Sequence, residues 1–240
     1  PVLLERVRAY EAREYSGNLA DLLLSHSFGR QMDKPGIWDY FKQIFQAPLK
    51  SLFQAQRFMR EQGLLHENGQ VKAPKEFREV FRRYGEDGWT AAARDTTYGG
   101  QGFPNMMRIV INDFMYGACQ SFNMAPSLTH GAAHLIESFG TEALKQAFVP
   151  RMYNGSFSGT MCLTEPDAGS NLAATQTMAY PDGDKYRIKG SKIFISWGDH
   201  DIADNIVHLI LARIEGAPEG VKGISLFVVP KYRLDENGEP

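Results

Sequence analysis

The spacing of apolar residues changes near Gly155, and this change constrains the fold of the 240-residue chain more than any other feature of its sequence. Before Gly155, apolar side chains recur with the repeat of an amphipathic helix. Pro74 opens one such segment through Phe77, Phe81 and Tyr84, because proline fits the first turn of a helix. The same spacing predicts helices over residues 2–27, 37–62, 105–122 and 127–139.

The last predicted helix of this region has clear start and stop signals. Gly140 is expected to end the preceding helix in the left-handed conformation. Thr141 is expected to cap the next helix, with Glu142 in its first turn. That helix should end near Val149, because Pro150 disfavours its continuation.

The remaining segments are short and rich in β-branched and aromatic residues, which favours strands. Asp182-Gly183 and Lys189-Gly190 supply turn residues. The predicted strands are residues 157–163, 185–197, 205–214 and 223–230. The predicted fold class is therefore α+β, with an all-helical domain over residues 1–155 and the start of a β-sandwich or β-barrel domain over residues 156–240.

Composition argues against several classes of protein. A net charge of −2 offers no basic excess for a nucleic acid backbone. No apolar run approaches the roughly 20 residues that span a bilayer. Cys119 and Cys162 lie far apart, so neither a disulfide framework nor a zinc site is expected, and a cytoplasmic location is favoured. Because the chain starts at Pro1 and residues 235–240 resemble a turn, we expect a fragment of a longer protein.

Two hydroxyl-bearing segments carry the strongest functional signal. The first is residues 161–170, with the sequence MCLTEPDAGS, and the second is residues 192–196, with the sequence KIFIS. The hydroxyls of Thr164, Ser170 and Ser196 could bind the polar edge of a ring. We therefore expect the two segments to face one ligand.

Other residues of these segments suit the same purpose. Phe194 offers a flat apolar face, and Pro166 with Gly169 should form a tight turn that directs backbone N–H groups toward a ligand. Glu165 could act as a general base. In a tight turn, however, its carboxylate is better suited to orienting neighbouring N–H groups.

Weaker motifs favour structural interpretations. The Gly-rich loop at residues 98–102 lacks the flanking elements of a nucleotide-binding loop and reads as a turn between helices. His130 and His134 share a helix face, but the small residues between them suggest helix packing. The acidic cluster at residues 199–204 reads as a solvated loop, and Cys162 as an inert strand cysteine. No metal site is predicted.

The two segments, in this order and after a helical region, resemble the flavin-contacting motifs of the acyl-CoA dehydrogenase family. Residues 164–170 match T-E-P-x-A-G-S, and residues 192–196 match K-x-[WF]-I-[TS]. The loop at residues 98–102 is similar to a third family signature, and the resemblance extends from about residue 75 to residue 230. Residues 128–133 and 220–227 are most similar to a long bacterial subgroup that includes 3-methylmercaptopropionyl-CoA dehydrogenases.

This resemblance implies an enzyme that uses FAD to dehydrogenate an acyl-CoA thioester between its α and β carbons. A carboxylate removes the α-proton, the β-hydride passes to flavin N5, and an electron-transfer flavoprotein accepts the electrons. The family's catalytic Glu lies in a C-terminal helical domain beyond residue 240, so no catalytic base is implied within this chain. In the family, that domain also forms the interface between subunits, so the resemblance implies a homo-oligomer in the complete protein.

The resemblance also assigns residues to the cofactor. Ser170 is expected to contact either the flavin or the CoA chain of the substrate, Phe194 to lie against the ring, and Ser196 to donate toward N5. The residues implied to bind FAD are Met161, Leu163, Thr164, Ser170, Phe194, Ile195 and Ser196.

The sequence departs from the family pattern at three positions, which are Asn171, Trp197 and Asp199. Asn171 removes a charge near the cofactor, and the other two are larger than the usual residues. Two alternatives stay open. One is a non-catalytic module or partner subunit that binds flavin or acyl-CoA, and the other is an acyl-CoA oxidase.

Overall fold

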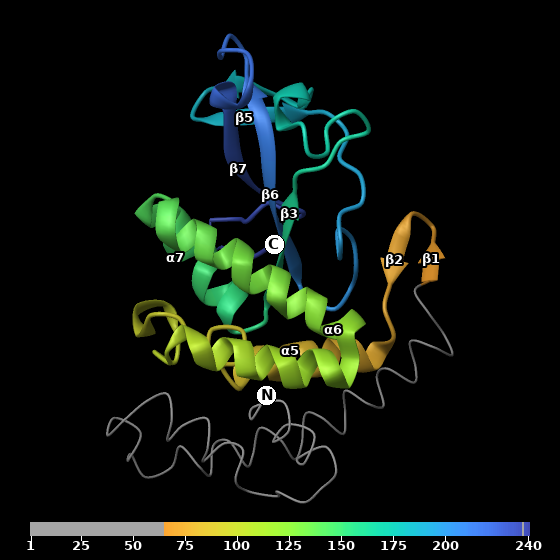
Figure 1. Ribbon diagram of the computed structural model, residues 1–240, viewed down its shortest axis with the longest axis vertical. Helices are drawn as coiled ribbons and strands as arrows, with labels where there is room; N and C mark the ends of the chain where they lie inside the picture. The colour runs from red at the N-terminus through yellow and green to blue at the C-terminus, as the bar shows by residue number, and fades with distance from the viewer. Residues whose placement is uncertain (1–64, 237) are drawn as a thin grey trace, which may run out of the picture. The chain divides into compact units, whose positions relative to one another are not determined.

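The computed structural model describes residues 65–236 and 238–240 of the chain (Figure 1). The helices predicted over residues 2–27 and 37–62 lie outside the described residues. The described part begins with a hairpin of strands β1 (Leu65–Glu67) and β2 (Gln70–Lys72). Within this part, no helix is both long and apolar enough to cross a membrane.

Helix α5 (Lys75–Glu86) begins after Pro74, as predicted, and buries Phe77, Phe81 and Tyr84 on one face. A short 3-10 helix, η2 (Thr96–Tyr98), leads into the Gly-rich loop. Gly100 in this loop lies so close to the backbone of Arg94 that a side chain would collide with it. The Gly-rich loop is therefore a tight turn, as predicted.

Helix α6 (Asn105–Phe139) consists of two helical parts that meet at a kink at Cys119, whose φ is −159° and ψ is 95°. The sequence predicted two helices, over residues 105–122 and 127–139. The interruption between them is confirmed, but its predicted position is wrong. We expected it between residues 122 and 127, but Pro126 lies inside the second part of α6. In that part of α6, Pro126 lacks the backbone N–H that would otherwise donate to the Phe122 carbonyl.

The boundary between α6 and helix α7 (Glu142–Tyr153) corrects two predictions. Gly140 has extended backbone angles (φ −72°, ψ 157°) instead of left-handed ones, and glycine is needed because an added Cβ would lie 2.6 Å from the Ile136 carbonyl oxygen. Thr141 caps α7 by accepting from Leu144 N–H, as predicted. Helix α7 continues through Pro150 to its end at Tyr153, where buried side chains offset the lost hydrogen bond.

The strands form one mixed sheet around the long strand β6 (Asn205–Ile214). Strand β3 (Phe157–Cys162) runs parallel to the first half of β6, and β4 (Met178–Asp182) pairs parallel with its end. Strand β7 (Ile224–Pro230) runs antiparallel to β6, and β5 (Lys185–Lys189) forms a hairpin with β4. Two short 3-10 helices, η3 (Leu172–Ala174) and η4 (Val221–Gly223), lie in the connections.

Three of the predicted strands are confirmed, but the strand predicted over residues 185–197 ends at Lys189, and β4 was not predicted. One face of β3 and β6 packs against α6 and α7 (Figure 1). A Cβ on Gly159 of β3 would lie 2.7 Å from the Cβ of Ala132 on α6. The Gly159 N–H also donates to the Thr129 hydroxyl of α6 (3.0 Å), so this contact joins sheet and helix closely.

Candidate functional site

The segment after β3 folds into the tight turn that the sequence predicts. Glu165 N–H donates to the Ala168 carbonyl (2.9 Å), and Ala168 N–H donates back to the Glu165 carbonyl (3.2 Å). Pro166 lies within this turn, and its ring restricts the backbone φ angle at that position. The exposed tip of the turn is therefore held by its own backbone.

The Glu165 side chain points inward from the turn and is almost fully buried. Its Oε2 accepts from Gln176 N–H (2.7 Å), and its Oε1 accepts from Thr177 N–H (3.1 Å) and from the Lys192 ammonium (2.7 Å). Burial alone would raise the pKa of Glu165, but hydrogen bonds from Lys192, Thr177 and Gln176 outweigh it and lower the pKa to about 2. The carboxylate thus stays charged and orients neighbouring N–H groups.

Lys192 joins the two hydroxyl-bearing segments. Besides binding Glu165, its ammonium donates to the Leu163 carbonyl (3.1 Å), and the next N–H, of Ile193, donates to the Thr164 carbonyl (2.9 Å). The side chains of Lys192 and Glu165 are 9% and 4% exposed, so the ion pair is desolvated. The two segments therefore lie side by side, as expected, although residues 190–196 form no strand.

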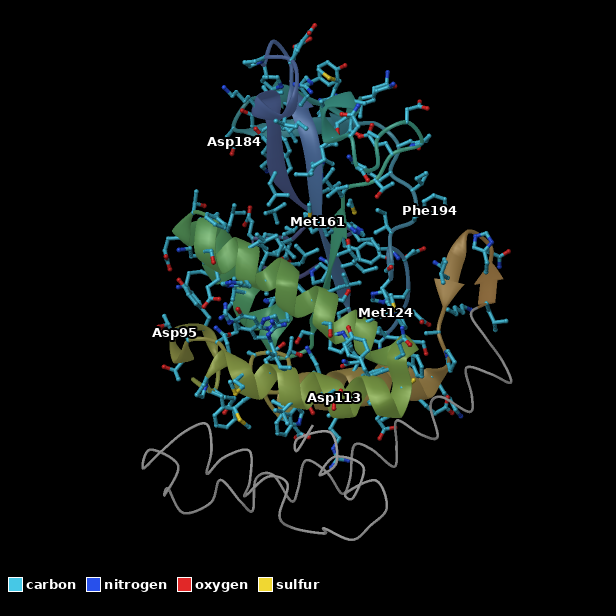
Figure 2. The ribbon with its side chains drawn as sticks, viewed as in Figure 1. Asp95, Asp113, Met124, Met161, Asp184 and Phe194 are labelled. Atoms are coloured by element: carbon cyan, nitrogen blue, oxygen red, sulfur yellow. The ribbon has the colours of Figure 1, made fainter. Side chains whose placement is uncertain are left out.

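The second segment ends in an unusual turn. Phe194 (φ 57°) and Trp197 (φ 53°) both have left-handed backbone angles, and Gly198 N–H donates to the Ile195 carbonyl (3.0 Å). A left-handed backbone costs a bulky residue about 1–2 kcal/mol. Phe194 is nevertheless 88% exposed, and Figure 2 shows it at the outer side of its loop. Such strain at an exposed aromatic residue suggests a functional role.

The other predicted site residues line the same two segments. Thr164 and Leu163 are half-buried, and Met161 is half-buried against the core between sheet and helices. Ser170 and Ser196 are exposed. Within the described residues, no hydrogen bond occupies the side-chain hydroxyls of these two serines or of Thr164. The hydroxyls that the sequence singled out thus remain available to a ligand.

The residues present fit a flavin. An aromatic face and uncommitted hydroxyl donors stand on adjoining segments, whereas the charged groups beneath them are neutralised by each other. A planar heterocycle with a polar edge suits this combination of groups.

A polar layer behind the first segment was missed by sequence reasoning. On β3, the Ser158 hydroxyl contacts His200 Nε2 (2.9 Å), and the Thr160 hydroxyl contacts His208 Nδ1 (2.7 Å). Burial lowers the pKa of His200 to about 4, so its imidazole is neutral at pH 7. The prediction of a solvated loop was therefore wrong for His200. Only the parallel register of β3 and β6 brings His208 opposite Thr160, and local sequence does not reveal that register.

The remaining motifs are structural. Burial raises the pKa of Cys162, which agrees with an inert thiol. His130 is buried, contacts the Thr90 carbonyl through Nδ1 (2.8 Å), and has a pKa lowered to about 4 by burial. Across residues 65–236 and 238–240, no group of three His, Cys, Asp or Glu side chains is arranged to hold a metal ion.

Comparisons with known proteins agree with this arrangement. Residues 52–156 match the acyl-CoA dehydrogenase N-terminal domain model, and residues 160–238 match the acyl-CoA dehydrogenase middle domain model. Over 179 residues the chain is 41% identical to a 3-methylmercaptopropionyl-CoA dehydrogenase of Ruegeria pomeroyi, covering 74% of this chain and 30% of that relative. Over 173 residues it is 38% identical to a broad-specificity linear acyl-CoA dehydrogenase of Mycobacterium tuberculosis, covering 71% and 28%.

A solved structure shows the same architecture. The crystal structure of an acyl-CoA dehydrogenase from Geobacillus kaustophilus aligns with a TM-score of 0.64 and 28% identity, covering 80% of this chain and 48% of that one. The chain therefore spans about half of this structure and less than a third of the two sequence relatives.

Proposed function

Since the chain belongs to the acyl-CoA dehydrogenase family, we propose that the full-length protein catalyses the FAD-dependent α,β-dehydrogenation of an acyl-CoA thioester. One observation carries the proposal. Lys192 binds both Glu165 and the Leu163 carbonyl, and so holds together the two segments that present hydroxyls and an aromatic face. The matches to both domain models support it.

In this proposal FAD, when bound, supplies the acceptor for the β-hydride of the substrate. Thr164 and Ser196 donate hydrogen bonds to the edge of the ring, and the exposed face of Phe194 lies against it. Met161, Leu163 and Ile195 border the same ring, and Ser170 reaches the flavin or the CoA chain. Hydrogen-bond donors that are already oriented toward the ring stabilise the negative charge that the flavin gains on reduction, because they need no reorganisation during the reaction.

Proton abstraction requires a base, and Glu165, the carboxylate of the first segment, is unsuited to that role. Glu165 is 5% exposed, and its carboxylate accepts hydrogen bonds from two backbone N–H groups and from Lys192. It is therefore poorly placed to reach a substrate carbon. A pKa of about 2 also makes it a weak base. As the family resemblance implies, we assign α-proton abstraction to a carboxylate of the full-length protein other than Glu165, in a helical domain that follows these residues.

The proposed partners follow from the same chemistry. The substrate is an acyl-CoA, the electron acceptor is an electron-transfer flavoprotein, and the full-length protein is a homo-oligomer. Relatives of this chain are named as dehydrogenases of butyryl-CoA and of linear acyl-CoA, which supports an acyl-CoA substrate.

The test is turnover of acyl-CoA thioesters by the full-length protein, with an artificial electron acceptor under anaerobic conditions. The proposal expects acceptor reduction that depends on bound FAD. An absence of turnover despite stoichiometric FAD contradicts it and favours a non-catalytic binding module. Stoichiometric oxygen consumption in air, at the rate seen with the artificial acceptor, favours an acyl-CoA oxidase instead.

A further inference from the structure

Trp197 contacts the helical part of the protein from the end of the second segment. Its indole N–H donates to the Ser121 carbonyl of α6 (3.0 Å), just after the kink at Cys119. Its ring stacks on Phe77 of α5, with ring centroids 6.1 Å apart and planes 30° apart. It also meets the buried His200 ring edge-on at 5.4 Å. Trp197 is thus fixed by groups from three parts of the fold.

These contacts explain the conformation of Trp197 but not that of Phe194. Both residues have left-handed backbone angles, which bulky side chains rarely adopt. At Trp197 the penalty is offset by the indole hydrogen bond and by ring packing. Phe194 is 88% exposed, so its own contacts with the described part of the chain are too few to offset its penalty.

The geometry connects the two residues. Only Ile195 and Ser196 separate them, and the Gly198 N–H closes the turn onto the Ile195 carbonyl (3.0 Å). At the other end, the turn is attached through Ile193 N–H to the Thr164 carbonyl. With both ends fixed, the short segment between them has few alternative backbone conformations. Fixing Trp197 therefore also fixes the direction of the Phe194 ring.

We propose that Trp197 is a positioning residue, which holds Phe194 and Ser196 in the orientation that binds the flavin ring. This inference rests on the proposed function, because it takes Phe194 to be a flavin contact. Trp197 acts through the backbone of the turn and through its contacts with Ser121 and Phe77. Through these contacts of Trp197, flavin binding depends on the packing of helices α5 and α6.

A double-mutant cycle on the full-length protein tests this proposal. The variants are Phe194→Ala, Trp197→Asn and the double variant, and asparagine is chosen because it tolerates left-handed backbone angles. The measurements are the dissociation constant of FAD and the visible-range circular dichroism of bound flavin. Trp89→Phe is the matched control, because Trp89 is a buried indole of the helical part.

We expect Phe194→Ala and Trp197→Asn each to weaken FAD binding about tenfold. If Trp197 acts through Phe194, the double variant binds FAD as weakly as either single variant, within about twofold. The flavin circular dichroism band should change in Trp197→Asn and stay unchanged in Trp89→Phe. If Trp197→Asn fails to fold, Trp197→Phe replaces it, since phenylalanine keeps ring packing but loses the donor to Ser121.

The outcomes separate the inference from the proposed function. Multiplied effects in the double variant, near a hundredfold, mean that Trp197 only stabilises the fold and overturn the inference alone. Unchanged FAD binding in Trp197→Asn, with a loss in Phe194→Ala, also overturns only the inference. Unchanged FAD binding in Phe194→Ala contradicts the flavin assignment of Phe194 and overturns the inference, whereas the proposed function is decided separately by turnover with bound FAD.

Discussion

Replacing Lys192 by methionine should strongly destabilise the protein. Methionine keeps the length and apolar stem of lysine but removes the ammonium that binds Glu165 at 2.7 Å. The Glu165 side chain is 4% exposed, so the variant leaves a carboxylate buried without its cation. Removing one partner of a buried ion pair costs about 3–5 kcal/mol.

The pKa of Glu165 gives an independent magnitude. It falls from an ordinary 4.5 to about 2 in the folded protein. At about 1.4 kcal/mol per pKa unit, the carboxylate and its hydrogen bonds contribute about 3 kcal/mol of folding stability at neutral pH. Because the folded pKa is the lower one, this stability is fully present above pH 4.5 and is lost as the pH falls toward 2.

Urea unfolding at several pH values measures both effects in the full-length protein. Lys192→Met should lose about 3–5 kcal/mol at pH 7 and should show a weaker loss on acidification below pH 4.5 than the wild type. Lys231→Met is the matched control, because Lys231 pairs with Asp199 at 2.6 Å while the two side chains are 29% and 37% exposed. Such an exposed pair contributes about 0–1 kcal/mol. Equal losses in the two variants would refute the reasoning.

Three further predictions concern catalysis, packing and pH. Glu165→Gln should leave the rate of flavin bleaching by acyl-CoA largely intact when FAD is saturating, and a drop of several orders of magnitude in rapid-reaction experiments would make Glu165 the base. Gly159→Ala should cost about 1–3 kcal/mol in urea unfolding, because its Cβ would lie 2.7 Å from Ala132, whereas exposed Gly131→Ala should not. The lowered pKa of His200 predicts that the free energy of unfolding falls as the pH drops from 6.5 toward 4, and that His200→Gln flattens this part of the stability profile. An NMR titration that gives His200 an ordinary pKa would contradict this prediction.

Local signals were sufficient for much of the fold. Helical spacing placed α5, and the Thr141 cap placed the start of α7. The tight turn at Glu165 was expected from Pro166, and its geometry confirms that expectation. These features depend on residues that are near each other in sequence, which is why the pattern of side chains predicts them.

Features that depend on distant residues were not predictable in the same way. The apolar residues near Phe194 suggested a strand, but Lys192 and Ile193 bond to the end of the first segment instead. Burial of Lys192 against Glu165 is visible only when the two segments are brought together. The left-handed backbone of Trp197 likewise depends on its partners on α5 and α6. Whether the chain divides into domains at residue 155 stays a prediction.

The reduction potential of bound FAD tests the central claim most directly. We predict that Thr164→Val and Ser196→Ala each lower the potential of FAD in the full-length protein, because each removes one hydroxyl donor from the ring edge. A lost donor in a dry site is worth about 1–3 kcal/mol, or roughly 20–60 mV for a two-electron couple. Both variants should also retain less FAD, while Thr96→Ala, an exposed hydroxyl on η2, should match the wild type. Wild-type potential and full FAD occupancy in both Thr164→Val and Ser196→Ala would contradict the flavin site described above.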